Sequence, residues 1–417
     1  MLDNQVPCST LKFNVTWTRK GGKMKQKVLI SFIFFWTVLI LFIDCGSQKS
    51  EWQGTIEKVD GVTIVKNPKQ GLWDSRENAD LTIVKKRQIG ELDGSEEFLF
   101  VDIADVTLNS KGDIYVADRR LNEIRKFNKD GEYLSTVGRK GQGPGEFQDI
   151  RTVSVNRNDD LIVFDGGLGR ISVFTDNGEH RETTKKLMVD SWIEPSKIFV
   201  TNGSYVFFGK LSNSLKLFHE FDRDWKITES HIDYEFIDNK EFEEINLGFH
   251  PGNCFLQNNN NILYTKYFCD NQIFIYRNKE LKKIVSRESD IKKPYDVQVF
   301  QDVKKAMDIR DPEYNFKLFG RGIAFIGKIY QCSLALYQLS DGYIVNFLSL
   351  RRSKDLWEFG VELYDEEGKF LHYTKLGENL YYDIRCKDSS DLFYAIDRKE
   401  FHKVITFRLE YPDARSE

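Results

Sequence analysis

Proline and methionine are scarce in this sequence, with 8 and 4 among 417 residues, whereas phenylalanine and tyrosine number 32 and 18. Aromatic side chains suit pleated, half-buried surfaces. An aromatic content of 14% beside 41% apolar residues excludes a disordered chain and provides for one large core or two ordinary ones. The composition therefore favours an all-β fold.

Motifs of common catalytic and cofactor sites are also absent. The sequence has no GxSxG elbow, P-loop, CxxC pair or closely spaced histidine pair, so it gives no support to nucleophilic, nucleotide or zinc chemistry. The stretch DGGLGR at 165–170 has glycines without the P-loop spacing. The turns NKDG and DEEG lack the spacing of a calcium-binding EF-hand loop. We therefore predict neither a cofactor nor a metal site.

A single long apolar run lies near the N-terminus, from Val28 to Ile43, after Lys25 and Lys27. Sixteen residues are short for a membrane span and typical of the apolar region of a secretory signal. Cys45 and the small polar residues after it resemble the lipobox of bacterial lipoproteins, although Asp44 departs from that pattern. We predict an over-extended start at 1–23, a signal peptide at 24–44, lipidation of Cys45 and a linker at 45–61. An uncleaved N-terminal anchor is the alternative.

The charge and the cysteines fit an exported protein. Residues 1–44 carry six basic and two acidic side chains, so the chain from Cys45 has 54 basic and 62 acidic ones and a net charge of −8. Such a surface does not favour nucleic acid. The later cysteines could form two disulfides in any of three pairings, or could remain buried free thiols. They are Cys254, Cys269, Cys332 and Cys386.

An internal repeat organises the sequence. The stretch from Val106 to Gly131 aligns without a gap on the stretch from Val153 to Gly178, at a constant offset of 47 residues. Each copy reads as short strands separated by polar turns, and a further strand follows in the first copy. Four antiparallel strands in about 47 residues match one blade of a β-propeller.

Weaker copies continue to Leu409 and bring the count of units to six. The fourth and fifth copies are separated by an insertion near 290–322, with helical character around 303–307, followed by a strand in GIAFIGKIYQC at 322–332. The alternative for this segment is a seventh blade. The sixth copy stops after its third strand, whereas residues 83–98 resemble the end of the first copy. We therefore predict that an N-terminal strand completes the last blade and closes the ring.

The pattern of IYVAD, an apolar strand and GPGEF resembles the NHL-repeat six-bladed β-propellers, particularly their exported bacterial lipoprotein type. VTIVKNP at 62–68 resembles the lead-in segment of that family. The resemblance implies a six-bladed propeller of the NHL/TolB-like class over 62–412, preceded by a signal or lipoprotein segment. It implies a fold and a location in the cell envelope rather than a reaction.

The repeat also supplies the candidate site residues. Asp118, Asp165 and Asp397 occupy equivalent positions after an apolar strand, where we expect each carboxylate to cap a turn by accepting backbone N–H groups. A ring of metal ligands, as in propeller lactonases, is the alternative for these three residues. Three further structural positions lie at the glycine-rich blade boundary RKGQGPGEF and just before it, namely Gly138, Gly145 and Phe147. Three arginines near blade turns are candidates for ligand binding, namely Arg119, Arg151 and Arg170.

These features predict a binding module rather than an enzyme. The expected partner is an envelope protein or an extracellular glycan or peptide, with membrane attachment through an N-terminal lipid or anchor and no contact with nucleic acid. The expected location is the bacterial cell envelope, on its periplasmic side or at the surface. A metal-dependent lactonase or lyase on the same fold is the alternative. The sequence offers no histidine motif for it, since the six histidines, at 180, 219, 231, 250, 372 and 402, are scattered.

Overall fold

The computed structural model describes residues 51–184, 193–200, 204–211, 216–233, 253–257, 261–266, 271–291, 295–309, 316–320, 323–353, 355–379 and 382–411. The predicted start segment, the signal peptide, Cys45 and Cys269 lie outside the described residues. No helix in the described ranges has the length and apolar character needed to cross a membrane.

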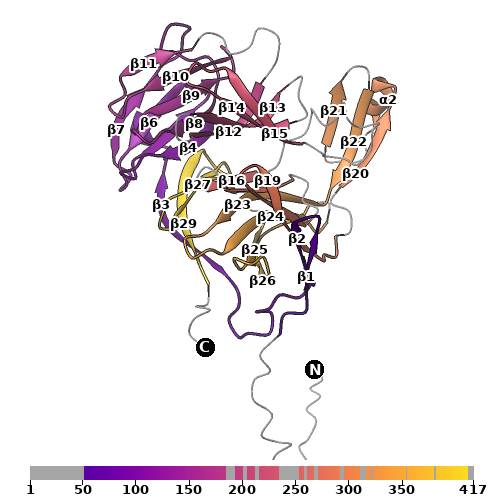
Figure 1. Cartoon of the computed structure of the whole chain (residues 1–417). Helices are drawn as coiled ribbons and strands as arrows, with labels where there is room; N and C mark the ends of the chain where they lie inside the picture. Colours follow the sequence, from indigo (N-terminus) through magenta and orange to yellow (C-terminus); the bar gives the residue numbers. More distant parts are fainter. Residues whose placement is uncertain are drawn as a thin grey trace, which may run out of the picture. The chain divides into compact units, whose positions relative to one another are not determined.

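Six sheets form the blades of a propeller, which confirms the predicted fold class (Figure 1). Each blade is an antiparallel meander, and the first strand of each is the innermost. Blade one contains β4 (Ile103–Leu108), β5 (Ile114–Asp118), β6 (Glu123–Phe127) and β7 (Tyr133–Val137). Blade two contains β8 (Ile150–Val155), β9 (Leu161–Asp165), β10 (Arg170–Phe174) and β11 (His180–Thr183).

The remaining blades follow the same order. Blade three contains β12 (Ile193–Val200), β13 (Tyr205–Leu211), β14 (Lys216–Phe221) and β15 (Ile227–Asp233). Blade four contains β16 (Asn253–Gln257), β17 (Asn261–Thr265), β18 (Gln272–Arg277) and β19 (Glu280–Arg287). Blade five contains β23 (Gln331–Gln338), β24 (Ile344–Arg351), β25 (Trp357–Tyr364) and β26 (Phe370–Glu378). Blade six contains β27 (Tyr382–Lys387), β28 (Phe393–Asp397), β29 (Lys403–Glu410) and β3 (Thr82–Ile89).

The ring is closed by pairing the two ends of the propeller sequence. Strand β3 pairs antiparallel with β29, from Val404 opposite Ile89 to Glu410 opposite Thr82. The N-terminal strand thus supplies the fourth strand of blade six, as the incomplete last copy of the repeat predicted. Closure pairs β29 with β3 and so removes a free strand edge that would favour aggregation.

The core lies between the blades. The second strands β5 and β9 are buried along their whole length because sheets cover both of their faces. Side chains from blades one and two share one apolar cluster, which includes Tyr115, Phe147 and Phe174. Similar clusters fill the other described interfaces, so the energy of the fold comes mainly from the packing of one blade on the next.

An N-terminal hairpin widens blade four. Strands β1 (Thr55–Val59) and β2 (Val62–Asn67) form the hairpin, and β2 runs parallel to β19. The segment expected as a linker at 45–61 therefore differs from that expectation, since 55–59 is a strand. Buried Asn67 fixes the hairpin, because its amide donates to Ser286 O at 3.0 Å and Gly368 O at 2.9 Å while its oxygen accepts from Phe370 N at 2.7 Å.

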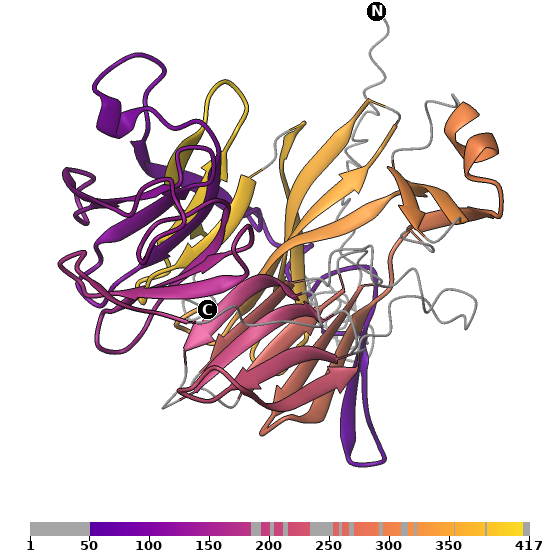
Figure 2. The ribbon, with the colours of Figure 1, turned by 90° about the horizontal axis from the view of Figure 1, so that it is seen from above.

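The segment between blades four and five forms a small unit of its own, drawn in orange at the outside of the ring in Figure 2. Strands β20 (Tyr295–Phe300), β21 (Phe316–Gly320) and β22 (Ile323–Ile329) form a sheet in the order β20-β22-β21, and helix α2 (Val303–Asp308) precedes β21. Ala306 of the helix packs on Ala324 and Ile326. GIAFIGKIYQC, expected as one strand after the insertion, is instead divided, because β22 belongs to the insertion and β23 begins blade five.

The described cysteines carry no disulfide. Cys254, Cys332 and Cys386 are free thiols, and the first two are buried. Of the two possibilities left open by the sequence, these three residues follow the free-thiol one. Burial raises the pKa of the Cys386 thiol to about 12, so this thiol is protonated at neutral pH.

Turns on one face of the ring also connect adjacent blades. We call this face, which carries the turns after the first and third strands of each blade, the hairpin-turn face. Between blades one and two, Asp176 accepts hydrogen bonds from Lys126 at 2.6 Å, Lys111 at 2.7 Å, and Asn109 and Tyr115 at 2.9 Å each. Asp176 therefore fills this gap between two blades.

We predict that Phe147→Ala lowers the free energy of unfolding by about 3–5 kcal/mol, because the ring is fully buried and its removal leaves a cavity. Urea denaturation followed by tryptophan fluorescence measures the loss. Phe98→Ala is the matched control, since Phe98 is the equivalent residue before blade one and is only half-buried. Equal losses for the two variants would contradict the assigned role of Phe147.

Asp176 makes stability depend on pH. Burial alone would raise its pKa, but hydrogen bonds from Lys111 and Lys126 hold the pKa well below its usual range. A lowered pKa in the folded state adds stability above the unfolded pKa, near 4, and this stability is lost as the pH falls through the folded value.

We predict that Asp176→Asn lowers the free energy of unfolding by about 2 kcal/mol at pH 7. The difference in unfolding free energy between the variant and the parent should stay constant down to about pH 5 and shrink below about pH 4. Below that pH Asp176 of the parent becomes protonated, first in the unfolded state and then progressively in the folded state, so the parent loses the charge that the variant lacks. Urea denaturation at several pH values measures it. A difference that grows toward low pH would show the opposite linkage.

Candidate functional site

The three repeated aspartates cap turns. Asp118 accepts four backbone N–H groups, from Val101 at 2.7 Å, Asp102 at 3.2 Å, Arg120 at 2.9 Å and Leu121 at 3.0 Å. Asp165 accepts an equivalent set, from residues 148, 149, 167 and 168. Asp397 accepts from Lys399 N at 2.9 Å and lies 3.6 Å from Lys403 Nζ. These carboxylates hold the strand ends in place.

The three candidate arginines are engaged by their own chain. Arg119 pairs with Asp102 at 2.5 Å, and Arg151 pairs with Asp149 at 2.7 Å. Arg170 donates to the carbonyls of the glycine-rich boundary, at 2.9 Å to Gln142 O, 2.5 Å to Gly143 O and 3.0 Å to Glu146 O. The arginines thus fix neighbouring loops, and the structure does not gather them around one cavity.

The boundary RKGQGPGEF is a packed connection. Gly138 has a φ of +78°, and a Cβ atom there would lie 2.2 Å from the ring of Phe147. Gly145 also has a positive φ, of +74°. Phe147 N donates to Arg139 O at 2.8 Å, and Gly141 N donates to Phe147 O at 2.9 Å. These backbone groups bond within the loop, so they are not directed at an anion.

Side chains from several blades meet at the centre of the ring. On the inner strands, Asp105 accepts from Thr152 Oγ1 at 2.6 Å and from Arg385 Nε at 2.8 Å, which joins blades one, two and six. Lys197 of blade three reaches Tyr337 of blade five, with 3.5 Å between Nζ and the hydroxyl. Burial lowers the pKa of Lys197. Side chains therefore cross the channel at this level, which leaves less room for a ligand there.

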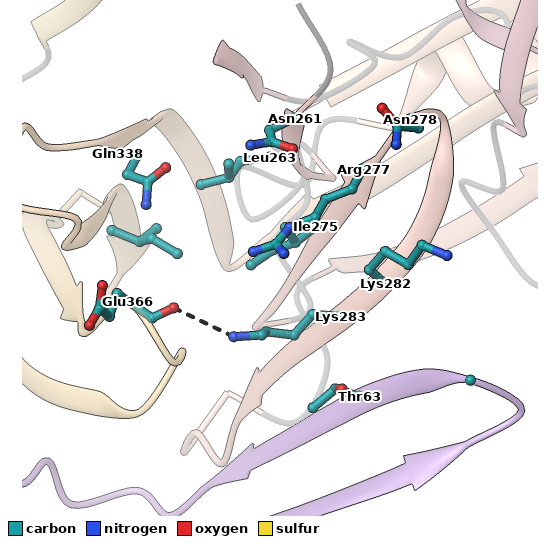
Figure 3. Close-up of a pocket in the computed structure, with 12 residues that line it drawn as sticks. Thr63, Asn261, Leu263, Ile275, Arg277, Asn278, Lys282, Lys283, Gln338 and Glu366 are labelled. Carbon is teal, nitrogen blue, oxygen red and sulfur yellow. Dashed lines mark hydrogen bonds between the residues drawn. The ribbon is translucent and has the colours of Figure 1, made fainter. Parts of the chain in front are cut away.

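An open pocket lies on the hairpin-turn face between blades four and five, and we call it the first pocket (Figure 3). Its volume is about 590 Å³. Its lining comes from β2, β17, β18, β19, β23 and β24 and from three turns. The lining residues are Gly61, Thr63, Asn261, Leu263, Ile275, Arg277, Asn278, Lys282, Lys283, Gln338, Ile344 and Glu366.

The lining of the first pocket includes three cations, Arg277, Lys282 and Lys283, and the carboxylate of Glu366, and Lys282 pairs with Glu280 of the same hairpin. Lys283 Nζ donates to the backbone carbonyl of Glu366 at 3.5 Å (Figure 3) and to that of Glu367 at 2.8 Å. Burial, and next the nearby Arg277, lower the pKa of Lys283. Arg277 is exposed and forms no ion pair with any described residue. The site is cationic although the whole chain carries a net charge of −4.

Hydrogen-bonding amides and an apolar base complete the first pocket. Leu263, Ile275 and Ile344 supply apolar surface, while Asn261, Asn278 and Gln338 supply amides. A guanidinium group binds a carboxylate through two parallel hydrogen bonds, and amides bind hydroxyl or carbonyl groups. The pocket is therefore suited to a ligand with both an anionic group and neutral polar groups.

The sequence interpretation missed this pocket because its lining comes from distant segments. One signal was present, since residues 277–283, RNKELKK, carry four basic side chains on a single hairpin.

For the metal-dependent alternative, the described residues contain no group of three or more His, Cys, Asp or Glu side chains placed to hold a metal ion.

Residues 89–321 match the family model DUF5128, described as a 6-bladed beta-propeller. No curated protein matches the sequence. A solved structure from the DUF4221 family, from Bacteroides vulgatus, has a TM-score of 0.52 at 9% identity, over 81% of this chain and 100% of that one. A Bacteroides fragilis protein described as exported has a TM-score of 0.52 at 13% identity, over 83% of this chain and 99% of that one.

At such low identity these likenesses show the fold alone. The matched family segment covers more than half of the chain and extends from the closing strand β3 to the insertion. The chain belongs to the DUF5128 family of six-bladed β-propellers.

Proposed function

We propose that this protein is an exported propeller lipoprotein of the NHL-repeat type that acts as a binding module in the cell envelope. Its ligand is an envelope glycan, peptide or protein that places an anionic group in the first pocket. The observation that carries the proposal is the cationic cluster on the β18–β19 hairpin, in which Arg277 is exposed and has no ion-pair partner among the described residues.

The other candidate surfaces support binding less well. Arg119, Arg151 and Arg170 are occupied by carboxylates or carbonyls of the chain, so a ligand would have to displace these partners. Lys197 and Tyr337 cross the central channel. In the first pocket, by contrast, a carboxylate can bind Arg277 without displacing an ion-pair partner among the described residues.

Membrane attachment is the second part of the proposal. The apolar run from Val28 to Ile43 and the polar residues that follow Cys45 support export and lipidation of that cysteine. A lipid at Cys45 would leave nine residues before β1, so the propeller would be held close to the membrane surface.

The binding part is tested with Arg277→Ala and a galacturonic acid disaccharide in isothermal titration calorimetry. We predict about tenfold weaker binding by the variant, because a hydrogen-bonded pair with a carboxylate contributes about 1.5 kcal/mol or slightly more at an accessible site. Binding by the parent protein should weaken when salt is raised, because salt screens exposed charges.

Lys304→Ala is the matched control, since it removes one exposed positive charge from helix α2, outside the first pocket. It should bind the disaccharide as the parent protein does. Equal weakening by the two variants would indicate only a general charge effect. Unchanged binding by Arg277→Ala would contradict the assignment of the first pocket.

The lipidation part is tested with Cys45→Ser in a bacterial host labelled with radioactive palmitate. We predict that the full-length parent chain incorporates label and that the variant does not, because only the thiol forms the thioether to the lipid. Label in both proteins, or in neither, would contradict lipidation at Cys45. Disaccharide binding does not depend on this result.

A further inference from the structure

A second pocket lies on the hairpin-turn face between blades two and three. Its volume is about 520 Å³. It also has three cations, Arg157, Arg181 and Arg223, beside two carboxylates. The full lining consists of Asn156, Arg157, Asn158, Asp160, Val173, Arg181, Glu182, Val200, Ser204, Tyr205 and Arg223.

The two pockets occupy equivalent places in the repeat. Each is bounded by the third and fourth strands of one blade and by two parts of the next blade. These parts are the ends of its first and second strands and the turn that follows its third strand. The turns have the same hydrogen bonds, since Trp225 N donates to Asp222 O at 3.1 Å and Gly368 N donates to Asp365 O at 3.0 Å. Arg223 and Glu366 are therefore the same position of two copies.

In blade two, the residue at this turn position fills the gap between blades one and two. This residue is Asp176, in a turn with the corresponding bond from Gly178 N to Thr175 O at 2.8 Å. The Asp176 carboxylate accepts hydrogen bonds from Lys111 and Lys126 of blade one, and these side chains fill the gap between blades one and two. A different turn, the one after the first strand of blade six, carries Asp391, which accepts across the gap from Ser340 Oγ of blade five at 2.5 Å. These bonded gaps contrast with the gaps that contain the first and second pockets.

Charges in the second pocket are partly available. Arg181 pairs with Asp160 at 2.6 Å, so that guanidinium has a partner. Arg157 and Arg223 are exposed and form no ion pair with any described residue. The second pocket therefore offers arginines to an anion in the same way as Arg277 does in the first.

Neutral groups in both pockets favour a carbohydrate over an acidic peptide. Asn158 in the second pocket and Asn261 and Asn278 in the first can bind sugar hydroxyls through their amides. Tyr205, in the second pocket, stacks on Trp225 with 3.9 Å between ring centroids, which holds its ring in a fixed orientation. A fixed aromatic ring and the partly exposed side chain of Ile275 provide contact area for the C–H face of a sugar.

We propose that the ligand is an acidic polysaccharide, and that one chain of it places carboxylate-bearing sugars in both pockets. This inference rests on the proposed binding function and deepens it. Two weak pockets filled by one polymer give a much higher affinity than either alone, because the second contact forms at a high effective concentration. A repeating polymer matches a repeating protein, since equivalent positions of two blades present equivalent groups.

The test uses digalacturonate and long polygalacturonate as probes, with Arg277→Ala, Arg223→Ala and the double variant. We expect the parent protein to bind two disaccharides in calorimetry, each single variant to bind one of them about tenfold more weakly, and the double variant to bind both about tenfold more weakly. For the polymer, each single variant should bind about tenfold more weakly than the parent, since the bivalent affinity is proportional to the affinity of each contact. Lys304→Ala should match the parent in both assays.

The alternative results separate the two proposals. If Arg223→Ala leaves the disaccharide binding and the polymer affinity unchanged while Arg277→Ala weakens both, the bivalent inference is wrong and the proposed function holds. If the parent protein binds neither probe, both are wrong for acidic sugars. If polyglutamate binds more tightly than polygalacturonate and depends on both arginines, the two-pocket geometry holds and the carbohydrate assignment is wrong. Circular dichroism of each variant verifies that it is folded.

Discussion

The pairing of β3 with β29 is the constraint on which the rest of the structure depends. It joins residues 82–89 to residues 404–410 and turns a row of blades into a closed ring. Without it, blade six would lack its outer strand, and Ile89 and Val404 would lose the core that they share with blade one. Because each blade packs on two neighbours, closure also fixes the spacing of the gaps between blades. In the proposed function those gaps, rather than the strands themselves, present groups to a ligand.

The same backbone turn has different consequences in different blades. Asp176, Arg223 and Glu366 hold one position of the repeat, and the side chain there decides whether the neighbouring gap is filled or lined with free charge. Asp176 attracts two lysines and closes its gap. Arg223 has no such partner among the described residues, and Glu366 faces the cations of β18 and β19 across an open pocket. The side chain at this turn position thus varies between blades, whereas the second strands of blades one, two and six all end in a turn-capping aspartate.

Sequence alone predicted the blades, the closing strand and the insertion because these leave local, periodic signals. The 47-residue offset between the first two copies fixes the register of Asp118 and Asp165, and the truncated last copy requires a strand from elsewhere. The parallel pairing of β2 with β19 left no such signal, because it joins segments more than 200 residues apart and depends on buried Asn67. Arg119, Arg151 and Arg170 were plausible ligands by position, but local carboxylates and carbonyls satisfy them. The pockets were missed because their walls come from two blades at once.

Hydrogen–deuterium exchange with and without oligogalacturonate tests most directly the claim that the ligand enters on the hairpin-turn face between blades. The account predicts slower exchange in residues 276–283 and 222–226, because a bound ligand reduces opening of the β18–β19 and β14–β15 hairpins. Residues 119–122 and 139–147, on the opposite face, should be unaffected. Protection confined to those opposite loops would contradict the account and place the ligand at the other end of the ring.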